Sequence, residues 1–297
     1  MIQPNYLQKN DTVAIVSTAR KISLQEIKSA IKLLESWGLK VVVGKTIGLE
    51  ENQLAGSDEK RTNDFQKMLD NPEIKAIWCA RGGYGTVRII DALDFTKFKK
   101  NPKWIIGYSD ATVLHNHLNN LGLETLHATM PINIPKNSNE AITTLKNSLF
   151  GKKLIYNITS SKKNKIGKAS GELIGGNLSV IYSLLGSKSS LNTANKILFI
   201  EDLDEYLYHI DRMMINLKRN GYFENLKGLI VGSMTDMHDN KIPFGKTAKE
   251  IILDIISEYD FPVVFDFPAG HIADNRTLIL GRKIMLEVDE NEVKLSF

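Results

Sequence analysis

The chain has 297 residues, of which 42% are hydrophobic and 24% charged, a composition typical of a globular protein of roughly two domains. Its net charge of +4 is small and its 38 Lys and Arg residues are spread among 34 acids, so we expect no nucleic-acid-binding surface. The single cysteine, Cys79, excludes an internal disulfide, and no stretch approaches a membrane span or a secretion signal, so we expect a cytoplasmic protein without a membrane partner.

The first part of the chain alternates between strand and helix patterns. Short apolar runs predict strands at 13–16, 41–43, 74–80, 104–108 and 125–130. Helical spacing of apolar residues predicts helices from the Ser23–Glu26 capping box to Gly38, and at 58–69, 86–93 and about 110–120. Buried strands separated by amphipathic helices indicate a parallel sheet covered on both faces. We therefore expect an α/β domain of the flavodoxin/Rossmann-like kind at residues 1–135.

The second part has a different pattern. Residues 136–168 are rich in Asn, Lys and Ser, and we interpret them as a polar linker. Beyond it we expect helices at about 177–185, 206–220 and 248–259, and strands at 196–201, 229–234, 263–267 and three times within 277–297. The last two of these strands flank residues 289–291 as a hairpin. Residues 169–297 are thus predicted to form a smaller, mixed β/α domain.

Ser109 lies where the predicted strand 104–108 passes into a helix. In an open parallel sheet this end of the strand faces the ligand crevice. Gly107 and Ala111 are small, as a sharp strand-to-helix turn around a nucleophilic serine requires. The N–H of Asp110 would then point toward a developing oxyanion. On this segment alone, a helix-capping role for Ser109 or Asp110 is the simpler interpretation.

A serine hydroxyl needs a histidine to take its proton and an acid to orient that histidine. His271 follows a predicted strand and a Pro/Gly-marked turn, so its side chain is free to reach a cleft. Glu201 ends the apolar strand 197–200. Asp202 is the alternative acid, and this acidic segment could also be a solvated turn. Together these residues form the minimum set for serine-based acyl transfer.

The glycine-rich segment 81–85 follows a strand but does not fit a dinucleotide-binding loop, because Arg88 stands where the third small residue should be. A close approach of backbone to substrate explains its glycines better. Gly82 contributes to such an approach, and Gly83 is a candidate for the second oxyanion N–H. Arg81 could bind a substrate carboxylate, although a surface ion pair explains it equally well.

Taken jointly, these segments resemble the LD-carboxypeptidase family of serine peptidases, which includes murein tetrapeptide carboxypeptidases and microcin C immunity peptidases. The resemblance covers nearly the whole chain. It rests on Ala80–Gly85, Gly107–Asp110, Gly171–Leu178, Ile200–Asp202 and Gly270–His271.

The resemblance implies that Ser109 is the nucleophile, His271 the general base and then acid, and Glu201 the residue that orients it. It also implies a homodimer with no metal and no cofactor. The implied reaction is hydrolysis of the bond to the terminal D-alanine of a murein stem tetrapeptide in cell-wall recycling. An immunity-type amidase that cleaves a peptidyl-nucleotide is the alternative, which the compact segment between Met130 and Gly171 disfavours. A non-catalytic ligand-binding protein with the same crevice is a further alternative.

Overall fold

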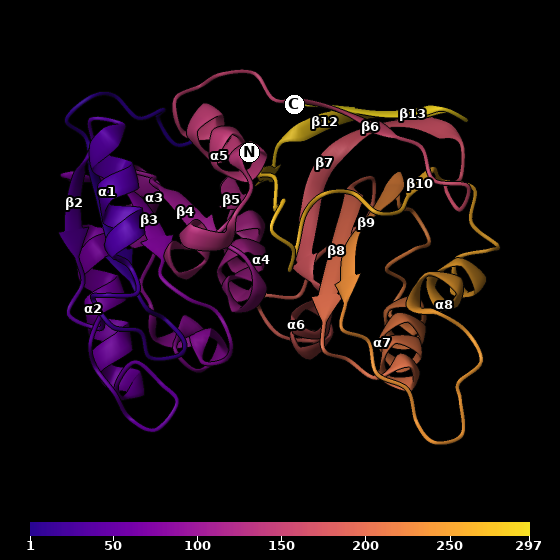
Figure 1. Cartoon of the computed structure of the whole chain (residues 1–297), viewed down its shortest axis with the longest axis horizontal. Coiled ribbons are helices and arrows are strands. Elements are labelled where there is room, and N and C mark those ends of the chain that lie inside the picture. The colour runs from indigo at the N-terminus through magenta and orange to yellow at the C-terminus, as the bar shows by residue number, and fades with distance from the viewer.

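A computed structural model describes all residues from 1 to 297 and contains two β-sheets that lie side by side (Figure 1). The first sheet has six strands in the order β11-β5-β4-β3-β1-β2. Its strands are β1 (Thr12–Val16), β2 (Lys40–Val43), β3 (Ile74–Cys79), β4 (Trp104–Gly107), β5 (Thr125–His127) and β11 (Leu278–Leu280). All pairs are parallel except β11, which runs antiparallel to β5.

Helices cover both faces of this first sheet, as predicted. Alternate strand residues point to opposite faces, so Ile15 and Trp78 pack on one side while Val16 and Ile77 pack on the other. The first face is covered by α1 (Lys28–Ser36) and α5 (Asn139–Leu149). The second is covered by α2 (Asp58–Asp70), α3 (Thr96–Lys100) and α4 (Thr112–Asn120).

The second sheet has seven strands in the order β10-β9-β8-β7-β12-β13-β6. Its strands are β6 (Ile155–Thr159), β7 (Gly167–Asn177), β8 (Ile197–Leu203), β9 (Gly228–Thr235), β10 (Val263–Val264), β12 (Lys283–Val288) and β13 (Glu292–Ser296). Strands β7 to β10 are parallel, and the β7–β12, β12–β13 and β13–β6 pairs are antiparallel. This is the mixed sheet that the sequence predicted, and β12 and β13 form the expected hairpin.

One face of the second sheet carries its own helices and the other shares a core with the first sheet. The helices α6 (Leu178–Ser183), α7 (Leu207–Arg219) and α8 (Ala248–Ile255) pack on the first of these faces. On the opposite face, Leu173 and Phe199 belong to the same buried cluster as Trp78 and Leu126 of the first sheet. The two sheets are therefore joined by continuous apolar packing, which fixes the ends of β4 and β8 relative to each other.

The structure corrects two expectations about the elements. Residues 136–168, predicted as a polar linker, contain α5 and β6, and the buried Leu145 and Leu149 of α5 pack into the shared core. Residues 86–93 do not form one α-helix. They form two short 3-10 turns, η1 (Thr86–Arg88) and η2 (Ile90–Ala92), because the first of them is held from outside by Asp110. No helix combines the length and the apolar character needed to cross a bilayer.

Candidate active site

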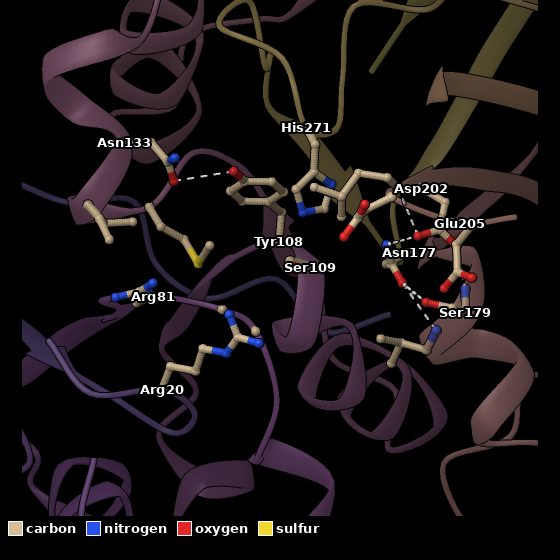
Figure 2. A pocket seen from close by; sticks show the side chains of 17 residues that line it. Arg20, Arg81, Tyr108, Ser109, Asn133, Asn177, Ser179, Asp202, Glu205 and His271 are labelled. Atoms are coloured by element: carbon tan, nitrogen blue, oxygen red, sulfur yellow. Dashed lines mark hydrogen bonds between the residues drawn. The ribbon is translucent and has the colours of Figure 1, made fainter. Parts of the chain in front are cut away.

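A cleft of about 560 Å³ opens where the carboxyl ends of β4 and β8 meet (Figure 2). Its lining comes from both sheets. Ser109 and the 81–83 segment belong to the first, whereas Asn177, Asp202 and His271 belong to the second part of the chain. Parallel strands place the ligand crevice at this edge of a sheet, so the cleft lies where the topology predicts it.

Ser109 occupies a sharp turn between β4 and the 3-10 turn η3 (Ser109–Ala111), which leads into α4. Its φ of +60° is a left-handed conformation that residues other than glycine seldom adopt. The turn is tight: a Cβ built on Gly107 would lie 2.9 Å from the Ala111 Cβ. Both positions must therefore be small, and a strained serine between two small residues is the geometry of a nucleophile elbow.

The segment 81–85 lies directly against this elbow. A Cβ on Gly82 would stand 3.0 Å from the Ser109 Oγ, so only glycine lets the backbone approach so closely. Gly83 has a φ of +107°, which also favours glycine. The N–H groups of Gly82 and Gly83 donate no hydrogen bond within the protein. They remain available to an acceptor in the cleft.

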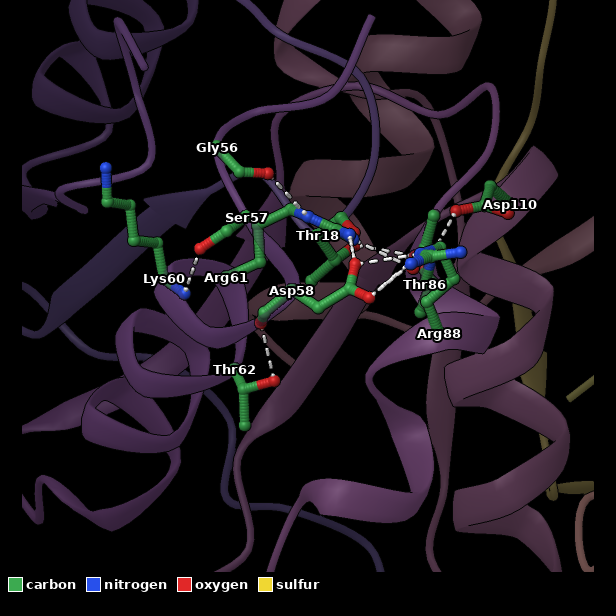
Figure 3. Close-up of polar contacts among 11 residues, drawn as sticks. Thr18, Gly56, Ser57, Asp58, Lys60, Arg61, Thr62, Thr86, Arg88 and Asp110 are labelled. Carbon is green, nitrogen blue, oxygen red and sulfur yellow. Dashed lines mark hydrogen bonds and ion pairs between the residues drawn. The ribbon is translucent and has the colours of Figure 1, made fainter. Parts of the chain in front are cut away.

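A buried polar network holds the two loops around the elbow (Figure 3). The Asp110 carboxylate accepts a 2.9 Å hydrogen bond from the Thr86 N–H, and burial raises the pKa of Asp110. The fully buried Arg61 donates to the carbonyl oxygens of Thr18, at 2.5 Å, and Gly85, at 2.8 Å. Its guanidinium also forms an ion pair with Asp58. Arg61 thus ties the loop after β1 to the glycine loop beside Ser109.

His271 and Glu201 form a direct pair on the opposite side of the cleft. The His271 Nδ1 lies 2.7 Å from the Glu201 Oε2, and the Glu201 side chain is fully buried. Burial alone would lower the pKa of His271, but the charge of Glu201 and its hydrogen bond more than offset this, so the pKa is raised. Because Nδ1 donates to a carboxylate, the Nε2 is the basic nitrogen.

The packing around this pair is close enough to fix the imidazole. A Cβ on Gly270 would lie 2.7 Å from the Glu201 Oε2. The ring of Tyr108 lies 4.7 Å from that of His271, and its hydroxyl donates to Asn133 at 3.2 Å. The imidazole therefore has one charged partner and one aromatic wall, which restrict its rotation.

Asp202, the alternative orienting acid, forms no hydrogen bond with His271. It accepts hydrogen bonds from the Asn177 side chain at 2.9 Å and from the Ser179 N–H at 2.8 Å. Burial, together with the nearby charge of Glu201, raises the pKa of Asp202 to about 7. Asp202 therefore fixes the start of α6 at the rim of the cleft, while Glu201 is the residue that contacts the imidazole.

The remaining histidines of the first sheet lie behind the site. His115 is fully buried and its Nε2 donates to the Gly107 carbonyl at 2.9 Å, while burial lowers its pKa to about 4. It therefore supports the elbow as a neutral side chain. His127 is also fully buried, and no group of three or more His, Cys, Asp or Glu side chains is arranged to hold a metal ion.

The structure brings the predicted site residues together, with Asp110 and Glu201 directly behind the cleft surface and the others at it. Ser109, His271, Arg81, Gly82 and Gly83 all line the cleft. Several further lining residues were not singled out as site residues from the sequence, among them Arg20, Tyr108 and Asn177. Asn177 had a usable signal, because its side chain caps α6 by accepting from the Val180 N–H. Arg20 had none, because its loop carries no motif.

Comparisons with known proteins agree over nearly the whole chain. A family model described as the LD-carboxypeptidase N-terminal domain matches residues 13–128, and one described as the LD-carboxypeptidase C-terminal domain matches residues 170–286. A probable murein peptide carboxypeptidase of Bacillus subtilis (strain 168) is 34% identical over 97% of this chain and 92% of its own length.

Two further relatives carry different functional names. The microcin C7 self-immunity protein MccF of Escherichia coli is 25% identical over 98% of this chain and 94% of its own length. A crystal structure of muramoyltetrapeptide carboxypeptidase from Oxalobacter formigenes is similar with a TM-score of 0.87 and 26% identity, over 96% of this chain and 98% of that one.

Proposed function

Because the chain belongs to the LD-carboxypeptidase family of serine peptidases, we propose that it removes the terminal D-alanine from murein stem tetrapeptides. One observation carries the proposal. The His271–Glu201 pair, contributed by the second part of the chain, lines or backs the same cleft into which the elbow of the first part presents Ser109. The names of the Bacillus and Oxalobacter relatives support a murein peptide as the substrate.

In the proposed mechanism the Ser109 Oγ attacks the scissile carbonyl carbon while the His271 Nε2 takes the hydroxyl proton. Glu201 holds the other ring nitrogen and stabilises the imidazolium. We assign the oxyanion to the backbone N–H groups of Asp110 and Gly83. His271 then returns the proton to the nitrogen of the leaving D-alanine as the C–N bond breaks. Water, deprotonated by His271, then attacks the acyl carbon, and the bond to the Ser109 Oγ breaks as His271 returns a proton to that oxygen.

The decisive experiment is mass spectrometry of a murein tetrapeptide before and after incubation with the protein. We expect the loss of one alanine. Ser109→Ala should lower turnover by on the order of 10⁴ or more, because it removes the hydroxyl that attacks the scissile carbonyl. The matched control is Ser257→Ala, since Ser257 is exposed just beyond the C-terminal end of α8, outside the cleft, and its hydroxyl donates only to the Asp254 carbonyl. Near-normal turnover by Ser109→Ala would exclude the mechanism.

The second candidate function is that of an amidase that acts on a peptidyl-nucleotide. The similarity to the E. coli immunity protein over 98% of this chain supports this candidate. Parallel assays on a murein tetrapeptide and on a peptidyl-nucleotide amide separate the two. Homodimerisation, implied by the resemblance, and a cytoplasmic location, expected from the sequence, are further parts of the proposal. Sedimentation velocity tests the first, through a species of twice the 33.3 kDa chain mass.

A further inference from the structure

The walls of the cleft carry opposite charge (Figure 2). The two arginines that line it, Arg20 and Arg81, both belong to the first part of the chain. The lining acids Asp202, Asp204 and Glu205 all belong to the second part. A peptide with one free carboxylate will therefore enter with that end toward the arginines, because the opposite wall repels it.

Arg81 is already engaged by the protein. Its Nη1 donates to the Lys21 carbonyl at 3.2 Å. It also borders a second hollow of about 230 Å³ that contains Glu26 and Glu50. The pKa of Glu26 is lowered mainly by hydrogen bonds from Ser23 and further by the charge of Arg81. The Arg81 guanidinium thus interacts mainly with the Lys21 carbonyl and with Glu26 in the second hollow, and not with groups beside Ser109.

Arg20 has a fixed backbone and an unpaired guanidinium. Its carbonyl accepts from the Ser17 hydroxyl at 2.7 Å, and Arg61 holds the same loop through Thr18. The Arg20 side chain forms no hydrogen bond or ion pair within the chain, whereas Lys21 beside it pairs with Glu50. An unpaired guanidinium on a loop with a fixed backbone can bind a ligand carboxylate through two parallel hydrogen bonds.

Two glycines place this guanidinium close to the nucleophile. A Cβ on Gly83 would lie 2.7 Å from the Arg20 Nε, and a Cβ on the adjacent Gly82 would lie 3.0 Å from the Ser109 Oγ. Arg20 and Ser109 therefore lie on either side of a two-glycine segment, and Figure 2 shows the Arg20 head directed toward the cleft. In a C-terminal residue, a single α-carbon separates the carboxylate from the nitrogen of the scissile bond. When Ser109 attacks that bond, the carboxylate therefore lies close to Ser109, which is where the Arg20 guanidinium is placed.

We propose that Arg20 binds the C-terminal carboxylate of the residue that leaves, and so restricts the enzyme to the last peptide bond of its substrate. The inference rests on the proposed function and extends it by assigning the residue that distinguishes a terminal bond from an internal one. An internal residue offers an amide in place of the carboxylate, which leaves Arg20 without its partner. The acyl part of the substrate then lies toward Asp204 and Glu205.

The test compares a murein stem tetrapeptide that ends in D-alanine with the same peptide ending in D-alaninamide. The wild-type protein should prefer the acid. Arg20→Gln should lower kcat/KM for the acid by about 10²-fold and for the amide by about threefold or less. Arg20→Lys keeps the positive charge but cannot form two parallel hydrogen bonds. Its kcat/KM for the acid should lie between those of the wild-type protein and Arg20→Gln. Arg81→Gln tests the other arginine of the cleft and should keep the preference for the acid. The matched control is Arg219→Gln, an exposed arginine at the end of α7 and outside the cleft.

Binding to the Ser109→Ala protein, measured by calorimetry with the same two peptides, separates this inference from the proposed function. If Arg20→Gln abolishes the preference for the acid in binding while the wild-type protein shows no turnover, the inference stands and the proposed function is wrong. An unchanged acid preference in Arg20→Gln, or equal losses on both peptides, would overturn the inference. Far-UV circular dichroism of each variant confirms that it is folded.

Discussion

The pairing of His271 with Glu201 sets the pH range in which the cleft can act. A general base must be neutral, and the charge of Glu201 raises the pKa of His271 above the ordinary value of 6.5. The proposed activity should therefore increase with pH and reach its plateau only above this raised pKa. Below it, His271 is protonated and cannot take the proton of Ser109.

Glu201→Gln should move the acidic limb of the pH profile to lower pH, because a neutral amide no longer stabilises the imidazolium. The maximal rate should also fall by ~10³–10⁴, since the imidazole loses its orienting charge. The measurement is kcat/KM between about pH 5 and 9. Asp202→Asn is the control: it does not bond His271 and should shift the limb less. Equal shifts in both variants would show that Glu201 does not affect the pKa of His271 more strongly than Asp202 does.

At this scale the sequence predicted which side chains gather at the cleft better than it predicted what they contact. Ser109 and His271 line the cleft and Glu201 contacts His271, but their roles remain proposals. The choice between Glu201 and Asp202 could not be made from adjacent positions in one strand. It depends on where Gly270 allows close approach, which is a property of the folded chain.

The elements around Ser109 act as a frame for a strained turn. A left-handed serine is unfavourable by itself and persists only where its surroundings determine it fully. Here β4 fixes one side of the turn, α4 the other, and His115 holds the Gly107 carbonyl from behind. The neighbouring glycine loop is fixed through Arg61 on α2.

Arg61→Met should destabilise the protein by about 3 kcal/mol, because it leaves the buried Thr18 carbonyl without a donor, removes one of the two donors to the Gly85 carbonyl and leaves Asp58 with one partner fewer. Urea unfolding measures this change. The control is Arg88→Met, which removes an exposed arginine from the same Asp58 and should change stability little. If the two variants are equally stable, the buried network does not hold the loops as described.

Helices and strands were predictable where their apolar residues follow a clear periodic pattern, and were missed or wrong where this pattern is diluted or overridden. The parallel strands of the first sheet follow from their apolar runs. Helix α5 was not predicted, because its three buried apolar residues, Ala141, Leu145 and Leu149, are separated by Asn, Lys, Ser and Thr. The 86–93 segment has a helical pattern, but the bond from Thr86 to Asp110 requires a different path there. Tertiary contacts overrode local preference in this case.

At the scale of the whole molecule, the two sheets are mutually dependent. Strand β11 comes from the second part of the chain but completes the edge of the first sheet, where Leu278 pairs with His127. The apolar core that contains Trp78 and Phe199 also crosses between the sheets. We still propose two domains, residues 1–135 and 169–297, but as units that share one core rather than as independently folding bodies.

A fragment of residues 1–168 should therefore fail to reach a native-like state, since it lacks β11 and half of the shared core. The full chain should unfold in a single transition. Near-UV circular dichroism of the fragment and urea unfolding of the full chain, followed by two probes, provide the measurements. Two separate transitions, or a fragment with a native-like spectrum, would show that the sheets are independent.

The place of β11 also has a consequence for how the protein is made. As the ribosome releases the chain, β5 emerges with an unpaired edge long before residues 278–280 have been translated. The scaffold of the proposed nucleophile is thus completed only after the imidazole and its carboxylate have left the exit tunnel. A nascent polypeptide that lacks residues 278–280 would carry the serine on an unfinished sheet, so we expect the proposed hydrolytic activity only once these residues have been translated.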